Sequence, residues 1–227
     1  MLRGLCSLLL YLITPLIWLR LLWRSRKQPE YLQHLAERYG FYRQTVPARL
    51  IWVHAVSVGE TRAAQPLIEG LQARWPEHRI LLTGMTPTGR DAGQQVYGDK
   101  VIRAYLPYDY PGAVDRFFRH FSPAFGVIME TEIWPNLLAA GKRRKLPIFL
   151  ANARLSARSA RGYGRFSALA GPAFSALTGV AAQTTGDAKR ISELGATAVE
   201  VCGNVKFDVT PPADKLVLSH QWRTAIG

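Results

Sequence analysis

The feature that most constrains the fold is an alternation, from Arg49 onward, of short apolar runs with stretches of helical spacing. Strands are expected at residues 50–56, 79–85, 101–107, 124–130, 147–153, 179–184 and 199–204. Helices are expected at residues 61–75, 88–97, 111–121, 134–145 and 186–195, and helical spacing returns at Tyr163, Phe166, Leu169 and Ala170. Because the strand-like runs are continuously apolar, helices should cover both faces of each strand. The pattern predicts an α/β fold built on a parallel sheet.

The net charge of the chain limits the kinds of partner that it is expected to bind. The sequence holds 29 Lys and Arg against 16 Asp and Glu, a net charge of +13. Such an excess attracts nucleic acid, an anionic bilayer or a phosphorylated substrate. A nucleic-acid surface would interleave aromatic residues with the basic ones, whereas Tyr163 and Phe166 fit a core stripe better, so no nucleic-acid partner is expected. Cys6 and Cys202 belong to no C-x-x-C pair, so neither a zinc knuckle nor a disulfide framework is expected.

An apolar segment opens the chain. Residues 5–23 contain one charge, Arg20, and would form a helix roughly 28 Å long, close to the hydrocarbon thickness of a bilayer. A basic cluster at 24–27 follows, which favours the cytoplasmic side for the rest of the chain. We predict a membrane-anchor helix over 1–27 rather than a signal peptide, which needs a small-residue exit, or a buried helix. Arg20 and Pro15 leave open whether it crosses the bilayer or lies partly in the interface.

The remaining chain divides into three parts. Residues 28–48 are expected to form an amphipathic helix or linker that ends near Gly40 and lies either on the membrane surface or on the domain. Residues 49–209 form the sheet domain. Residues 210–227 begin with TPPAD, which predicts a hinge and the start of another helix.

Carboxylates follow two of the predicted strands. After the first, Ser57 and Gly59 allow a tight turn, and Glu60 falls at the start of a helix. Glu60 could be a capping charge or a general base; a helix N-terminus lowers a carboxyl pKa, so a base there would need some burial. After the fourth strand, Glu130 and Glu132 would share one face of an extended strand, and capping explains one acid more easily than two.

Hydroxyl, amide and basic side chains follow three other strands. They are Thr86, Thr88 and Arg90 after the second strand, Asn152, Arg154 and Ser156 after the fifth, and Lys206 after the last. Hydroxyls and an arginine at a helix N-terminus can bind an anion, although capping by either threonine also explains them. Arginines after a strand suit phosphate or carboxylate, and Lys206 could stabilise charge. No G-x-G-x-x-G follows the first strand, which argues against a dinucleotide oxidoreductase.

The chain resembles the lipid A Kdo (3-deoxy-D-manno-octulosonic acid) transferases in five segments, HAVSVGE, TGMTPTG, METEIWP, NARLS and GNVKFD, in this order and spacing. The N-terminal anchor followed by ERYGF matches as well. The resemblance covers essentially the whole chain, and SVGE together with METEIWP is its most specific part.

The resemblance implies an inverting, metal-independent glycosyltransferase of the two-domain GT-B type, with this chain as its N-terminal Rossmann-like domain. It implies transfer of Kdo from CMP-Kdo to a lipid A precursor (lipid IVA) in lipopolysaccharide biosynthesis. The reaction would take place on the anionic surface of the bacterial inner membrane, at its cytoplasmic face, without a cofactor. The second domain, which binds most of the donor, is absent here, so the chain alone is expected to be inactive. The alternative is a non-catalytic module that binds an anionic lipid.

The resemblance also implies roles for individual residues. Glu60 matches the family's general base, and Glu130 and Lys206 match positions assigned to transition-state stabilisation. The motif leaves open whether Glu130 or Glu132 carries that role. The residues expected to bind substrate are Ser57, Gly59, Thr86, Thr88, Arg90, Glu132, Asn152, Arg154 and Ser156.

Overall fold

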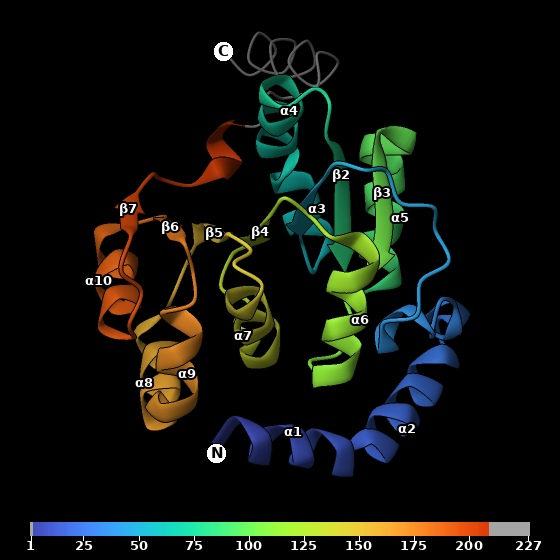
Figure 1. Cartoon of the computed structure of the whole chain (residues 1–227), viewed down its shortest axis with the longest axis horizontal. Coiled ribbons are helices and arrows are strands. Elements are labelled where there is room, and N and C mark those ends of the chain that lie inside the picture. The colour runs from blue at the N-terminus through green and yellow to red at the C-terminus, as the bar shows by residue number, and fades with distance from the viewer. Residues whose placement is uncertain (1, 209–227) are drawn as a thin grey trace, which may run out of the picture.

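A computed structural model of the chain describes residues 2–208 (Figure 1), so the predicted hinge at 210–227 lies outside the described residues. The strands are β1 (Leu50–His54), β2 (Arg79–Gly84), β3 (Val101–Tyr105), β4 (Phe125–Met129), β5 (Ile148–Ala153), β6 (Gly179–Ala182) and β7 (Val199–Val201). The α-helices are α1 (Leu2–Leu12), α2 (Thr14–Ser25), α3 (Val58–Ala63), α4 (Gln65–Arg74), α5 (Pro87–Tyr97), α6 (Pro111–Phe121), α7 (Pro135–Arg143), α8 (Ala157–Arg165), α9 (Ser167–Phe174) and α10 (Thr185–Glu193). Short 3-10 turns are η1 (Pro29–Leu32), η2 (Glu37–Tyr39), η3 (Gly98–Lys100) and η4 (Val205–Asp208).

The seven strands form one parallel sheet in the order β3-β2-β1-β4-β5-β6-β7. This confirms the predicted α/β class. From β1 the chain winds outward through β2 and β3, and then returns to add β4 on the other side of β1. The order of strands therefore reverses between β1 and β4, and the carboxyl ends of these two strands flank the position where such sheets bind ligands.

Two hydrophobic cores cover the two faces of the sheet. Successive side chains of a strand point to opposite faces, so Leu50 and Trp52 of β1 enter one core while Ile51 and Val53 enter the other. Helices α6, α7 and α9 complete the first core, and α4 and α5 complete the second. β1 and most of β2 and β4 are thus buried on both sides, as their sequence predicts. At the other end of the sheet this prediction is wrong, because Phe149 of β5 and Glu200 and Val201 of β7 are exposed.

The sequence misplaced several element boundaries. The helix expected at 61–75 is two helices, α3 and α4, since Pro66 in the first turn of α4 cannot continue the helix before it. The helical spacing around residues 163–170 is divided between α8 and α9. The last strand stops at Val201, shortly before Gly203, whose φ of +82° is incompatible with an extended strand.

The N-terminal segment is not the single helix that its composition predicts. It forms α1 and α2, which are bent by 48° at a break that precedes Pro15. Among residues 2–208, no single helix is long and apolar enough to cross a membrane, although the bent pair meets the length and composition requirements when its two helices are taken together. Figure 1 shows the pair running along one end of the domain.

One face of the α1–α2 pair packs against the domain. Asn136 Nδ2 donates to Ser7 Oγ at 2.9 Å, and the hydroxyls of Thr14 and Tyr110 lie 2.7 Å apart. The opposite face exposes a row of large apolar side chains, namely Leu2, Leu5, Leu8, Leu9, Leu12, Leu16, Leu19, Leu22 and Trp23. The pair therefore directs its polar contacts and Leu21 at the domain, and exposes most of its other leucines.

The helix predicted within 28–48 is not present. This segment contains only the short turns η1 and η2, and Gly40 ends η2 with a φ of +81°. It packs on the domain: the Arg116 guanidinium donates to the Tyr39 carbonyl, and the Tyr42 hydroxyl donates to the Tyr105 carbonyl. Of the two placements that the sequence left open, the structure shows the packed one.

Candidate functional site

The turn after β1 holds Glu60 in a reciprocal capping arrangement. Ser57 Oγ accepts from the Glu60 N–H at 3.3 Å and donates to Glu60 Oε1 at 2.9 Å, and Glu60 Oε2 accepts from the Val56 N–H at 2.9 Å. This resembles the capping box of a Ser-x-x-Glu sequence, except that Glu60 accepts from the N–H of Val56 rather than from that of the N-cap residue Ser57. Glu60 therefore takes part in capping α3, which leaves open whether it is also a general base. The same contacts fix the carboxylate at the carboxyl end of β1. Gly59 is exposed and makes no close approach there.

The loop after β4 carries the other two acids. Glu130 takes a left-handed backbone conformation with φ of +56°, which is uncommon for a residue with a side chain. Because the strand ends at Met129, Glu130 and Glu132 are not on one face of an extended strand, contrary to the sequence-based expectation. Lys206 Nζ lies 3.7 Å from Glu130 Oε1.

Asn152 ties the last segment of the described chain to the same edge of the sheet. It is buried, has φ of +54°, and its Oδ1 accepts from the Val205 N–H at 3.2 Å. Its backbone carbonyl accepts from Gln183 Nε2 at 3.0 Å. The anchored Val205 brings the neighbouring Lys206 back over the ends of β4 and β5. Asn152 thus acts here by positioning a loop.

Burial and mutual repulsion govern the pKa values of these acids. Burial raises the pKa of Glu60 above its ordinary value, opposed by the Val56 N–H and the Ser57 hydroxyl, while Glu130 raises it and Lys206 lowers it further. Burial thus offsets the lowering expected at a helix N-terminus.

Glu132 is shifted further. Burial raises the pKa of Glu132 to about 7, with the Glu60 charge as the next cause and Glu130 adding to it. The Trp134 indole opposes this rise, although its Nε1 makes no hydrogen bond within the described residues. Glu60, Glu130, Glu132 and Lys206 are therefore electrostatic neighbours, and we call these four residues the Glu60 cluster.

The other predicted site residues divide between this cluster and the surrounding surface. Thr86 caps α5 through the Gly89 N–H and donates to the Val56 carbonyl at 3.3 Å, so it lies beside the turn that holds Glu60. The remaining ones are exposed or engaged elsewhere: Thr88, Arg154 and Ser156 are exposed, Ser156 caps α8, and Arg90 binds Glu37. None of these four makes a polar contact with the cluster in the described structure. Their role in substrate binding stays a prediction.

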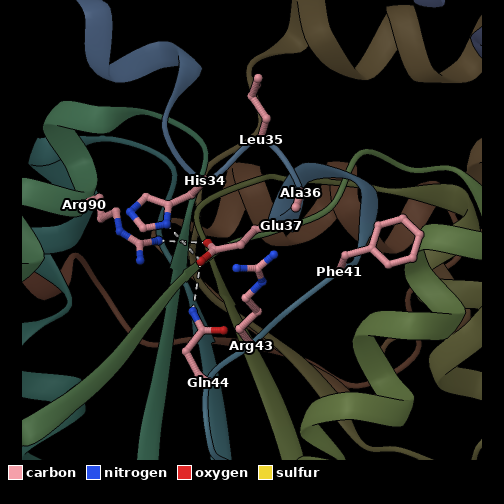
Figure 2. Close-up of a pocket in the computed structure, with 8 residues that line it drawn as sticks. All are labelled: His34, Leu35, Ala36, Glu37, Phe41, Arg43, Gln44 and Arg90. Atoms are coloured by element: carbon pink, nitrogen blue, oxygen red, sulfur yellow. Dashed lines mark hydrogen bonds and ion pairs between the residues drawn. The ribbon is translucent and has the colours of Figure 1, made fainter.

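The pocket around Arg90 lies apart from the cluster. It has a volume of about 630 Å³ and is lined by His34, Leu35, Ala36, Glu37, Phe41, Arg43, Gln44 and Arg90 (Figure 2). Figure 2 shows Arg90 and Gln44 both directed at the Glu37 carboxylate, which accepts from them at 2.9 Å each. Glu37 Oε2 also accepts from the Tyr105 N–H at 2.7 Å. Sequence reasoning missed Glu37, a carboxylate that joins the 28–48 segment to the end of β3.

The raised pKa of Glu132 predicts a pH-dependent gain in stability when its charge is removed. A carboxyl with a folded-state pKa of about 7 against an ordinary 4.5 stabilises the fold when protonated and loses that contribution as pH rises through 7. Glu132→Gln should therefore stabilise the protein by about 1–2 kcal/mol near pH 8, after allowance for partial solvent exposure, and by little near pH 4. Urea unfolding at both pH values measures this, with exposed Glu193→Gln as control. A gain that is equal at the two pH values would contradict it.

Comparisons with known proteins identify one family whose model matches most of the chain. Residues 33–209 match the family model described as 3-deoxy-D-manno-octulosonic-acid transferase (kdotransferase). The chain is 42% identical to the 3-deoxy-D-manno-octulosonic acid transferase of Bordetella pertussis, with 99% of this chain and 54% of the relative covered. It is 42% identical to the enzyme of that name from Haemophilus influenzae, with 88% and 48% covered. The chain thus spans about half the length of these relatives.

Among solved structures, a UDP-N-acetylglucosamine 2-epimerase aligns with a TM-score of 0.51 at 11% identity, covering 70% of this chain and 49% of the other. The UDP-GlcNAc 2-epimerase of Neisseria meningitidis aligns with a TM-score of 0.51 at 14% identity, covering 69% and 47%. At such low identity these structures share the fold and indicate nothing about activity.

Proposed function

Because this chain belongs to the 3-deoxy-D-manno-octulosonic-acid transferase family, we propose that it is the acceptor-binding half of an enzyme that transfers Kdo from CMP-Kdo to a lipid A precursor. The observation that carries the proposal is the Glu60 cluster. Its residues come from the loops after β1, β4 and β7, and they are neighbours where the strand order reverses. That is the position at which parallel sheets bind ligands.

In this proposal Glu60 is the general base. Its raised pKa makes it a better proton acceptor than an ordinary carboxylate, and its contacts to Val56 and Ser57 fix its position. It takes the proton of an acceptor hydroxyl as that oxygen forms a bond to the anomeric carbon of Kdo. The bond from that carbon to the CMP phosphate oxygen breaks, and CMP leaves with the electron pair. Attack opposite to the leaving group inverts the configuration.

The other charges of the cluster support the same step. Positive charge develops on the sugar ring as the donor bond breaks, and the Glu130 carboxylate stabilises it. Lys206, at 3.7 Å from Glu130, stabilises the negative charge on the departing phosphate. Glu132, with its pKa near 7, holds a proton for part of the time at neutral pH and so limits the repulsion on Glu60. No metal or cofactor takes part in this scheme.

A two-domain GT-B enzyme would place most of the donor contacts in a second domain. We therefore expect the 227-residue chain alone to show no transfer, and a chain extended to the length of its relatives to transfer Kdo from CMP-Kdo to lipid IVA. Thin-layer separation of the lipid products from both proteins tests this. Transfer by the 227-residue chain would overturn the expectation that a second domain is needed for donor binding. Inactivity of the extended chain on CMP-Kdo and lipid IVA would overturn the substrate assignment.

The α1–α2 pair is proposed as the membrane attachment at the cytoplasmic face of the bacterial inner membrane. Its exposed leucines can enter the apolar layer while Arg24 and Arg26 meet anionic headgroups. Since its other face is packed on the domain, a position in the interface fits better than a crossing. In a flotation assay the chain should rise with anionic vesicles. A variant in which several of these leucines are replaced by serine should stay in the bottom fraction.

A second candidate function is a non-catalytic module that binds an anionic lipid. The net charge of +13 and the exposed face of α1–α2 favour it. The two functions differ in what Glu60 does, so a single substitution at this residue separates them.

A further inference from the structure

A second, strongly basic pocket lies where α2 meets the loops after β2 and β3. It has a volume of about 300 Å³ and is lined by Ile17, Arg20, Leu21, Arg24, Tyr31, Arg38, Met85, Thr86 and Tyr108. Three of these side chains are arginines and none is an acid. A cavity with this lining has a strong positive potential and suits an anion.

Arg38 is the residue that points to a ligand. Its side chain is only 2% exposed, and its Nη1 donates to the Met85 carbonyl at 3.1 Å. Its Nε and Nη2 are buried and have no hydrogen-bond partner within residues 2–208. No described carboxylate forms an ion pair with it, since the adjacent Glu37 is bound to Arg90. The ring of Tyr105, 4.1 Å from the guanidinium carbon, offsets part of this charge.

A buried guanidinium with two unused donors is costly unless a partner supplies charge and acceptors. Arg24 lies beside it in the pocket and is itself oriented by the Tyr31 hydroxyl at 3.1 Å. The charge of Arg20 is close enough to lower the pKa of Tyr108. Three arginines that line one pocket without an acid match a group with several charged oxygens better than a single carboxylate.

We propose that this pocket binds a phosphate group carried by an amphiphilic molecule lying along α2. The outer side of α2 exposes Leu19, Leu22 and Trp23, so an acyl chain could follow this surface while the phosphate enters the pocket. In identifying the amphiphile as the lipid acceptor, the proposal rests on the proposed function.

The pocket is also linked to Glu60. Thr86 lines the pocket and donates to the Val56 carbonyl at 3.3 Å, and the N–H of the same Val56 donates to Glu60. Only the turn that contains Val56 would therefore separate a phosphate held by Arg38 from the proposed base. This arrangement would orient a phosphorylated sugar with its phosphate in the pocket and a hydroxyl toward the Glu60 cluster.

The first test measures binding of inorganic phosphate to the 227-residue chain by calorimetry and by thermal shift, against chloride at equal ionic strength. Phosphate should raise the melting temperature, and Arg20→Gln and Arg24→Gln should each weaken its affinity about tenfold. Arg74→Gln is the matched control, because Arg74 is exposed in the last turn of α4 and does not line the pocket. Equal shifts by phosphate and chloride, or unchanged affinity in Arg20→Gln and Arg24→Gln, would overturn the proposal.

Arg38→Met adds a readout that a purely structural arginine would not give. Removal of an unpartnered buried charge should leave the melting temperature in chloride unchanged or higher, while the response to phosphate is lost. A lower melting temperature together with a retained phosphate response would argue against the pocket. If this variant does not fold, the Arg20→Gln and Arg24→Gln variants still decide the question.

Vesicles separate the two sources of phosphate. Phosphatidylcholine vesicles containing phosphatidic acid, which carries a phosphate monoester, should bind the chain more tightly than vesicles of equal charge containing phosphatidylglycerol. Arg24→Gln should remove this preference. A response to inorganic phosphate without the vesicle preference would overturn the lipid-borne assignment. None of these assays measures transfer, so failure of the proposed function would be seen separately, in the activity of the extended chain.

Discussion

Glu60→Gln in the chain extended to family length is expected to lower the rate of Kdo transfer by about 10²–10⁴-fold, the usual contribution of a general base. The loss would not come from unfolding. A glutamine serves the same capping box, since its carbonyl oxygen can accept from the Val56 N–H and its amide can donate to Ser57 Oγ. What glutamine cannot do is take a proton from the acceptor hydroxyl.

The control for this substitution is Glu69→Gln. Glu69 is an exposed glutamate on the next helix that accepts a hydrogen bond from Gln65 and lies outside the Glu60 cluster, so its variant should keep full activity. Because the base acts in its ionised form, activity of the unchanged enzyme should fall as pH decreases through a value above the ordinary pKa of a glutamate. Undiminished transfer by Glu60→Gln would remove Glu60 from the mechanism. If the extended chain binds the acceptor but transfers no Kdo, both as the unchanged protein and as Glu60→Gln, the lipid-binding alternative is favoured.

Gly126→Ala is expected to destabilise the protein by about 3 kcal/mol, because an added methyl group has no room in the middle of the sheet. A Cβ at Gly126 would lie 2.3 Å from one carbon of the Trp52 ring and 2.8 Å from another. The ring cannot yield, since Trp52 is fully buried and its Nε1 donates to Thr83 Oγ1 at 2.8 Å. Edge contacts with Phe117 and Phe118 hold it on the other sides.

The matched control for that substitution is Gly70→Ala in α4. A Cβ at Gly70 meets no atom within 4 Å, and alanine is the better helix former, so this variant should be stabilised by about 0.5–1 kcal/mol. Thermal unfolding of the two variants should move the melting temperature in opposite directions. A Gly126→Ala protein as stable as the parent would mean that β1 and β4 separate more easily than their packing indicates.

The sequence predicts the fold well because continuous apolar runs leave few alternatives to a covered parallel sheet. Its errors arise where a local residue overrides the periodicity. Pro66 divides one predicted helix, and the left-handed conformation of Glu130 ends a strand before its acids are reached. The 28–48 segment has helical spacing, yet Gln33 is extended and His34 has a φ of +54°, so the segment forms short turns instead.

The candidate site is only partly visible in the sequence. Glu130 follows β4 directly, and Glu60 and Lys206 come a few residues after β1 and β7, so the topology brings all three toward one edge of the sheet. The burial that shifts Glu132 depends on contacts between distant segments, and no spacing reveals it. Arg38 lies in the ERYGF segment as an ordinary basic residue, and only the folded chain shows that its guanidinium is enclosed without an acid.

The α1–α2 pair is fastened to the domain at several points along its length, through Ser7, Thr14 and the stacking of Trp18 on Tyr39. On the proposed membrane attachment, a domain held in this way would not swivel freely as it would on a flexible tether. Its tilt, and the height of the carboxyl ends of β1 and β4 above the bilayer, would then be fixed by the two helices. Lipids would then be selected by how far their headgroups extend above the bilayer, before the site makes any contact with their sugars.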